Sequence, residues 1–176
     1  AQAVDGAEII FVVLPAFAHA YVAQELAGCL VDGQTVVVCP GATGGALEFR
    51  AIWDRAGCRS KVRLCETNSL FYAARAQDAV ATISGVKDEL SLAALPAQDT
   101  QAIIDDLSDV YPQLIPAANV LETSLNNMNT VVHPLPVLLN AGSIERGEKF
   151  RHYFDGITPA VGEVVEQMDR ERVAVG

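Results

Sequence analysis

The sequence has little positive charge and no long hydrophobic run. Its 176 residues contain 12 lysines and arginines against 22 acidic residues, so the formal net charge is −10 and the pI is near 4.6. No basic run is present, which argues against nucleic acid or an anionic membrane as a partner. The longest apolar run, residues 9–14, is too short to cross a membrane and fits a strand.

Disulfide motifs and metal motifs are also missing. The four cysteines form no C-x-x-C pair, and Cys39 and Cys65 lie in apolar segments that are typical of buried, inert thiols. The three histidines are far apart and lack metal-ligand spacing, so we expect no metal site. The first residues carry no basic segment of the kind that begins a secretory signal. These features together predict a reducing, cytoplasmic setting.

What the sequence does contain is an alternation of strand and helix patterns. Near-continuous apolar runs, typical of strands buried on both faces of a parallel sheet, occur at 8–14, 34–39 and 61–66. Helical patterns at 17–29 and 46–57 connect these runs, which predicts right-handed βαβ units in an α/β fold. Residues 71–96 read as short extended segments, and we expect them to form an antiparallel or mixed edge of the sheet.

The last third of the chain has helical patterns. We expect helices at 99–112, 118–142 and 158–175, the last with Thr158 as N-cap. Pro134 and Pro136 must kink or break the second of these, because each removes a backbone donor. Prolines concentrate near 111–118. We therefore place the domain boundary there, with an α/β domain at 1–115 and a helical domain at 116–176.

Three loops lie where a parallel sheet usually binds ligands, beyond the carboxyl ends of strands. They are LPAF (14–17), PGATGG (40–45) and ETN (66–68). The second joins loop glycines to a helix N-terminus, where amides and the helix dipole favour an anion or the polar edge of a cofactor. It lacks the lysine of a P-loop and is not G-x-G-x-x-G, so a flexible turn is an equal alternative. Glu66 and Thr67 are either solvated loop residues or anchors for an ammonium or hydroxyl group.

His133 lies in NNMNTVVHPLPVLLNAG (126–142), where histidine is the natural proton donor near neutral pH. Asn129 and Asn126 stand at i−4 and i−7, which places three polar side chains on one helical face, with Asn127 pointing elsewhere. Burying such a row is costly, but a satisfied core histidine stays an open alternative. No carboxylate close in the sequence supplies a partner. The other two histidines are expected at a helix surface or rim (His19) and in solvent (His152).

Five ordered motifs carry a resemblance to a known family. They are FVVLPAFAHAYVA, PGATGGALEF, ETNSLFYAAR, LETSLNNMNTVVHPLPVLLNAGSIE, and FDGITPAV with MDRER. In this order and spacing the chain resembles the opine dehydrogenases, which include octopine and nopaline dehydrogenases. The resemblance covers essentially the whole chain, and the motif around His133 is the most distinctive part of it.

The resemblance implies a two-domain oxidoreductase. The fold would be the C-terminal part of a Rossmann-type doubly wound sheet, followed by the start of an all-α domain like the C-terminal domain of 6-phosphogluconate dehydrogenase. The reaction would be reductive condensation of an amino acid with a 2-oxo acid such as pyruvate, with NAD or NADP as cofactor. Arg75 and Arg151 are the candidates for binding the substrate carboxylates.

The resemblance also implies roles for individual residues. His133 would be the general acid/base. The substrate site would contain Glu66, Thr67, Asn129 and Asn126, and the cofactor would meet the two loops at Leu14, Pro15, Ala16, Pro40, Gly41 and Gly44.

The glycine fingerprint of such a domain would lie upstream of Ala1, and the carboxylate partner of His133 downstream of Gly176. We therefore expect an internal fragment, inactive alone, whose exposed sheet edge favours self-association, with a homodimer as one form. Two other functions stay open: another two-domain dehydrogenase acting on a hydroxy acid or sugar phosphate, and a non-catalytic cofactor-binding or assembly module. The asparagines and histidine argue against the first, because such relatives usually place a lysine there.

Overall fold

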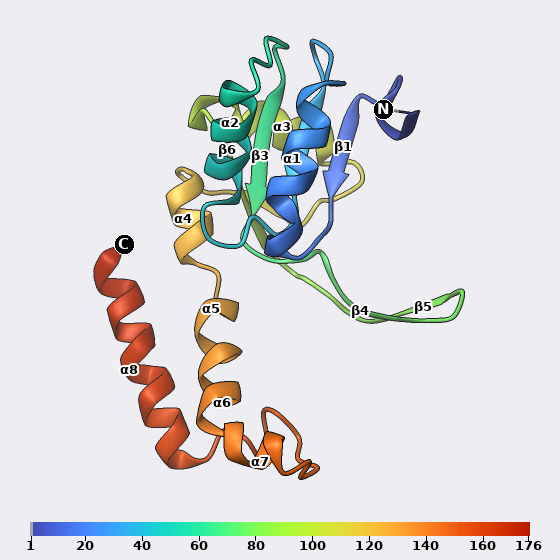
Figure 1. Cartoon of the computed structure of the whole chain (residues 1–176). Helices are drawn as coiled ribbons and strands as arrows, with labels where there is room; N and C mark the ends of the chain where they lie inside the picture. The colour runs from blue at the N-terminus through green and yellow to red at the C-terminus, as the bar shows by residue number, and fades with distance from the viewer. Residues whose placement is uncertain (1) are drawn as a thin grey trace. The chain divides into compact units, whose positions relative to one another are not determined.

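A computed structural model describes residues 2–176, which divide into two compact units, Ala1–Asn126 and Asn127–Gly176. The first unit is built on a five-stranded sheet with the order β1-β2-β3-β6-β7 (Figure 1). Its strands are β1 (Ile9–Val12), β2 (Thr35–Val38), β3 (Arg63–Thr67), β6 (Leu90–Ala94) and β7 (Leu114–Pro116). The first three strands are parallel, β6 runs antiparallel to β3, and β7 runs parallel to β6.

Helices cover both faces of this sheet. The unit contains three 3-10 turns, η1 (Gln2–Val4), η2 (Ala16–Ala18) and η3 (Ala97–Asp99). Its α-helices are α1 (His19–Ala27), α2 (Gly45–Arg55), α3 (Thr100–Leu107) and α4 (Val120–Leu125). Val36 and Val38 of β2 pack in one core cluster with residues of α1 and α2, whereas Val37 packs in a second cluster with residues of α3. Strand β2 is therefore buried on both faces, as its apolar run predicts.

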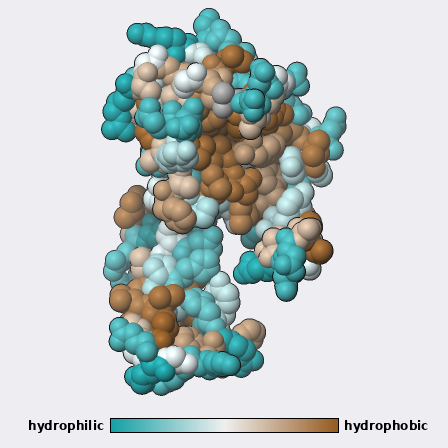
Figure 2. All heavy atoms as spheres, turned by 45° about the vertical axis from the view of Figure 1, so that its right-hand side comes forward, coloured by the Kyte–Doolittle hydropathy of each residue, from teal (hydrophilic) through white to brown (hydrophobic). Residues whose placement is uncertain are grey.

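Strand β1 is less buried than β2 among the described residues. It has β2 as its neighbour on one side and forms an edge of the sheet within the described residues, so Ile9, Ile10 and Phe11 are only partly buried. Two grooves with mainly apolar linings border it, with volumes of about 390 and 360 Å³. Figure 2 shows a broad hydrophobic area on the first unit. The apolar side chains of β1 therefore line these two grooves as well as packing against the hydrophobic core.

The segment that the sequence assigns to the sheet edge divides into two parts. Strand β6 joins the main sheet antiparallel to β3, in agreement with the prediction. Strands β4 (Tyr72–Gln77) and β5 (Val80–Val86) instead pair with each other as a separate two-stranded ribbon. The ribbon leaves the sheet as a long hairpin, and nearly all its residues are exposed (Figure 1).

The second unit contains short helices and one long helix. They are α5 (Asn129–Val132), α6 (Pro134–Leu139), α7 (Ala141–Glu145) and α8 (Pro159–Val175). The segment 118–142 is mostly helical and has a helix boundary at Pro134, as predicted, but the chain also leaves helical geometry after Leu125 and at Asn140, where no break was predicted. The predicted start of α8 is confirmed: Thr158 caps it by accepting a hydrogen bond from the Val161 amide. Within residues 2–176, no helix combines the length and apolar character that a bilayer crossing requires.

Candidate functional site

The loops after β1 and β2 lie at the carboxyl edge of the sheet, where the sequence predicts the cofactor. After β1, the chain exposes Leu14, Pro15 and Ala16, and Phe17 is 90% exposed. After β2, Gly41 is buried and its amide donates to the Thr67 carbonyl oxygen at 2.9 Å, which ties this loop to the end of β3. The first loop therefore offers exposed apolar surface, and the second is fixed to the sheet.

Glu66 lies at the centre of a buried hydrogen-bond network at this edge. Its side chain has no exposed surface. One carboxylate oxygen accepts from the Ala46 amide at 2.7 Å. The other accepts from the hydroxyls of Thr123, at 2.6 Å, and Ser124, at 2.9 Å. The Ser124 hydroxyl also accepts from the Gly44 amide at 2.9 Å, so the network joins β3, the PGATGG loop, α2 and α4.

This network changes how the PGATGG loop is interpreted. From the sequence, the amides at the start of α2 either bind an anion or the polar edge of a cofactor, or belong to a flexible turn. In the structure the Ala46 amide is already bonded to the carboxylate of Glu66, and the Gly44 amide to Ser124. The anion at this helix N-terminus is therefore the protein's own side chain. Contacts of Pro40, Gly41 and Gly44 with a cofactor stay predictions.

Burial raises the pKa of the Glu66 carboxyl, while the hydrogen bonds from Thr123, Ala46 and Ser124 act in the opposite direction. His19 is the nearby titratable group. A Cβ at Gly45 would lie 3.4 Å from Nδ1 of His19 and 3.6 Å from Oε2 of Glu66, so both side chains flank this glycine. His19 is only 1% exposed, and its Nε2 donates to the Leu14 carbonyl at 3.2 Å. The expected surface or rim position of His19 is wrong, because its ring is buried between the Leu14 carbonyl and Gly45.

The ETN segment has no exposed carboxylate or hydroxyl. Thr67 is fully buried, and its hydroxyl donates to the Ser69 carbonyl at 2.7 Å. Both side chains, Glu66 and Thr67, are fully buried, and their predicted contact with substrate stays a prediction. The next residue, Asn68, has a buried Oδ1 with no hydrogen-bond partner among residues 2–176. Sequence reasoning missed this acceptor, although it follows directly on the pair that was singled out.

His133 belongs to the second unit and its side chain is exposed, so the core-histidine alternative does not describe it. It is the residue between α5 and α6, where Pro134 opens the next helix. Its Nε2 lies 2.7 Å from the hydroxyl oxygen of Tyr153. The neighbouring His152 is half-buried rather than solvated as expected, because its Nε2 donates to the Val132 carbonyl at 3.3 Å. Tyr153 is a site residue that sequence reasoning missed.

The asparagines before His133 do not share one helical face with it. Asn126 directly follows α4, and Asn129 begins the four-residue helix α5. Asn127, expected to point elsewhere, is only 4% exposed, and its Oδ1 accepts from the Asn129 amide at 3.1 Å. Asn126 and Asn129 are exposed. The predicted row is wrong because α4 ends at Leu125 and α5 begins only at Asn129, so no continuous helix joins Asn126 to His133.

The two arginines that the sequence offers for substrate carboxylates lie in different surroundings. Arg75 is on the exposed hairpin and donates to the Ala74 carbonyl. Arg151 forms a two-pronged ion pair with Asp155, with both N–O distances at 3.1 Å, and its guanidinium lies over the Phe154 ring. This pair holds the pKa of the Asp155 carboxyl at about 2. Arg151 therefore has a carboxylate partner within its own loop.

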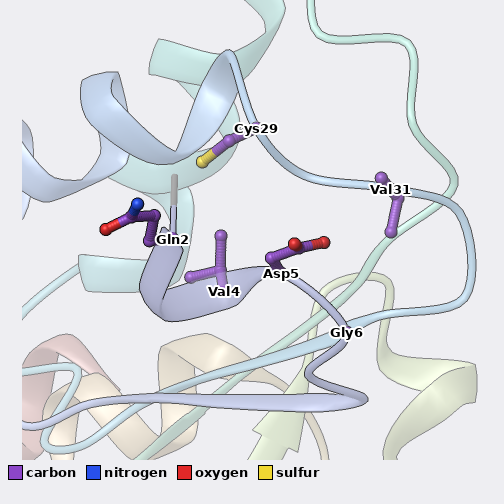
Figure 3. A pocket seen from close by; sticks show the side chains of 6 residues that line it. All are labelled: Gln2, Val4, Asp5, Gly6, Cys29 and Val31. Carbon is purple, nitrogen blue, oxygen red and sulfur yellow. The ribbon is translucent and has the colours of Figure 1, made fainter.

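Two further features lie outside the candidate site: one cavity and two buried cysteine thiols. A cavity of about 250 Å³ is lined by the residues labelled in Figure 3: Gln2, Val4, Asp5, Gly6, Cys29 and Val31. It lies before β1 and β2, at their amino ends, and so at the edge opposite the expected ligand edge. Burial raises the pKa of the thiols of Cys39 and Cys65, which keeps both protonated and inert, as the sequence predicts.

The fold is similar to that of solved opine dehydrogenases. A structure of octopine dehydrogenase with NADH and L-arginine matches 97% of this chain and 43% of that chain, with a TM-score of 0.72 and 23% identity. Yersinopine dehydrogenase with NADP⁺ matches 91% of this chain and 41% of that chain, with a TM-score of 0.76 and 20% identity. The predicted fold class, a Rossmann-type α/β part with a helical domain, is confirmed.

Sequence comparison points to the same family. Residues 116–176 match the family described as NAD/NADP octopine/nopaline dehydrogenase, alpha-helical domain. The opine dehydrogenase of Arthrobacter sp. (strain 1C) is 41% identical over 174 residues, which are 98% of this chain and 48% of that protein. Vitopine synthase of Allorhizobium ampelinum is 25% identical, again over 98% of this chain and 48% of its own length. The chain spans about half the length of these relatives. Over almost all of its own length it is similar to opine dehydrogenases, and its residues 116–176 match the helical domain of that family.

Proposed function

We propose that the whole protein is an opine dehydrogenase, which uses NADH or NADPH to condense an amino acid reductively with a 2-oxo acid such as pyruvate. The observation that carries this proposal is the exposed imidazole of His133 in the helical unit, within the segment that matches the family. Related structures support the substrate class, since octopine dehydrogenase has been solved with L-arginine, with agmatine and with pyruvate.

The first unit has features that fit a dinucleotide. Its exposed residues Leu14, Pro15 and Ala16 follow a strand of the parallel sheet, at the edge where such cofactors bind. The buried Oδ1 of Asn68, at the same edge, has no donor among the described residues and suits an N–H of a ligand. A side chain at Gly41 would overlap the Glu66 carboxyl, so a glycine at this position lets the PGATGG loop pack directly against Glu66. When bound, NADH or NADPH supplies the hydride.

His133 handles protons in this proposal. As a base, the neutral imidazole takes a proton from the substrate ammonium group and frees the amine to attack the carbonyl carbon of the oxo acid. As an acid, the imidazolium returns that proton to the hydroxyl of the resulting adduct, which leaves as water. The product of these steps is the protonated imine, because the histidine returns the one proton that it took and the positive charge stays on the substrate nitrogen. We place the exposed amides of Asn126 and Asn129 at the substrate. We assign Glu66 and Thr67 a positioning role at the same site, because both side chains are fully buried and hydrogen-bonded to neighbouring loops and helices.

The test is an assay of the full-length protein with pyruvate, a panel of amino acids, and NADH or NADPH. We expect cofactor oxidation that requires both pyruvate and an amino acid. His133→Ala should lower kcat by about 10²–10⁴-fold, which is typical for loss of a general acid or base. Its melting temperature should stay near that of the wild type, because the side chain is exposed.

Two results would contradict the proposal. Oxidation with pyruvate alone, independent of the amino acid, would identify a hydroxy-acid dehydrogenase. Binding of NADH without turnover of any combination would identify a non-catalytic module. Unchanged turnover in His133→Ala, with the condensation itself confirmed, would remove His133 from the acid–base role.

A further inference from the structure

We propose that Tyr153 is the positioning residue for His133, holding its imidazole in one orientation and, when neutral, in one tautomer. This inference rests on the proposed acid–base role of His133. It starts from the 2.7 Å contact between Nε2 of His133 and the Tyr153 hydroxyl. The sequence offered His133 no partner nearby, and the structure supplies one that lies 20 residues further along the chain.

The segment that carries Tyr153 is fixed to the helices at three places. His152 donates to the carbonyl of Val132, the residue directly before His133. The Asn140 side-chain amide, at the end of α6, donates to the Gly156 carbonyl at 2.8 Å. The Tyr153 bond to His133 lies between these two. Adjacent residues of one segment therefore bind adjacent residues of the other, which distinguishes this contact from an isolated pair of surface side chains.

The Tyr153 ring is itself held in place. It packs edge-to-face against the His152 ring, with centroids 4.7 Å apart and an interplanar angle of 89°. The side chain is 55% exposed, so the protein holds the ring without enclosing it. This arrangement orients the hydroxyl toward Nε2 and leaves the rest of the imidazole accessible.

A tyrosine hydroxyl suits an acid–base histidine because it is both donor and acceptor. In the neutral ring that acts as a base, Nε2–H donates to the Tyr153 oxygen, and the lone pair of Nδ1 is free to take the substrate proton. When the imidazole is protonated, Nε2–H still donates to the same oxygen, and Nδ1–H is the proton that the ring returns. The bond therefore persists through both halves of the acid–base cycle, and the ring does not have to turn between them.

The Nδ1 atom remains for a second contact. Within residues 2–176, no protein group is hydrogen-bonded to it in the structure. Because Nε2 is bonded to Tyr153, Nδ1 is the ring nitrogen that remains free to contact another group. Without the hydroxyl, the ring can rotate and either nitrogen can carry the proton.

The test removes only the hydroxyl, as Tyr153→Phe in the full-length protein. With pyruvate, NADH or NADPH, and the amino acid from the panel that gives the fastest turnover, kcat should fall about 10-fold to 100-fold, as for a misplaced catalytic group. The KM for the cofactor should not change. The matched control is Tyr21→Phe, whose side chain is 69% exposed on α1, and it should keep wild-type kcat.

The second readout does not depend on turnover. The protein is labelled with ¹⁵N-histidine, and the His133 signals are identified by their loss in His133→Gln. We expect the neutral wild-type ring to show the Nε2–H tautomer, and Tyr153→Phe to show a mixture of both. If no substrate combination is turned over, the proposed function fails and the spectra still report the contact. An unchanged kcat, or a lower kcat with an unchanged tautomer, would overturn the inference.

Discussion

Glu66 in the first unit and His133 in the second occupy opposite environments. Glu66 has no exposed surface, and its two oxygens accept three hydrogen bonds from the protein. His133 is exposed and bonds to one neutral hydroxyl. A carboxylate held this way organises the protein around it, whereas an exposed imidazole with one hydrogen-bond partner can still meet a substrate. A position at the end of a strand does not by itself make a residue a ligand contact.

The largest effect on stability is expected from Glu66→Ala. The change leaves a cavity and removes the acceptor of the Ala46 amide and of the Thr123 and Ser124 hydroxyls, at a cost of about 3–5 kcal/mol. The measurement is the free energy of unfolding of the protein in urea. Glu25→Ala, on the exposed side of α1, is the control and should stay within about 0.5 kcal/mol.

Tyr153→Phe sharpens the comparison in the same experiment. It removes one exposed hydrogen bond, so its free energy of unfolding should also change by no more than about 0.5 kcal/mol. A large loss of stability in Tyr153→Phe, or a small one in Glu66→Ala, would reverse the roles that we give the two sites.

Gly41→Ala should have an intermediate effect. The added Cβ would overlap the Glu66 carboxyl and lie 2.7 Å from the Glu66 Cβ, and the buried Glu66 side chain has no free space into which to move. Overpacking of this kind costs about 1–3 kcal/mol. Gly28→Ala is the matched control, since nothing lies within 4 Å of its added Cβ. Equal melting temperatures for the two variants would show that the PGATGG loop moves freely relative to β3.

The smallest effect concerns pH and compares the wild type with Glu66→Gln. Burial raises the pKa of the Glu66 carboxyl, so the folded protein binds this proton more tightly than the unfolded chain does. The stability that the proton contributes is complete below the unfolded pKa, about 4.3, and is lost as the pH rises through the raised folded value. Glu66→Gln lacks this titration. The stability of the wild type relative to Glu66→Gln should therefore fall from pH 4 to pH 8, and a rise would contradict the direction of the shift.

Much of the fold could be predicted from hydrophobic patterning. The runs at 34–39 and 61–66 predicted β2 and β3, and Thr158 with Pro159 predicted the start of α8. The errors share a cause, which is that local patterns do not report partners. The extended pattern at 71–96 does not separate a strand of the sheet from a free hairpin, and the helical pattern at 118–142 does not show where one helix ends and the next begins.

The candidate site was predictable only in part. The motif around His133 pointed to its chemistry, and the family match includes this segment. Its hydroxyl partner, Tyr153, and the buried contacts of Glu66 with Thr123 and Ser124 join residues 20, 57 and 58 positions apart. No local spacing rule reaches across such distances.

By itself, the sequence determined the order of strands and helices, the resemblance to opine dehydrogenases, and the histidine that we propose for acid–base chemistry. Periodicity and motifs are local properties, and the sequence contains them completely. Only the tertiary structure decided that Glu66 is enclosed by α2 and α4, that His19 is buried, and that Tyr153 binds His133. Burial and hydrogen-bond partners depend on which distant segments meet when the chain folds, and those contacts determine what each polar side chain can do.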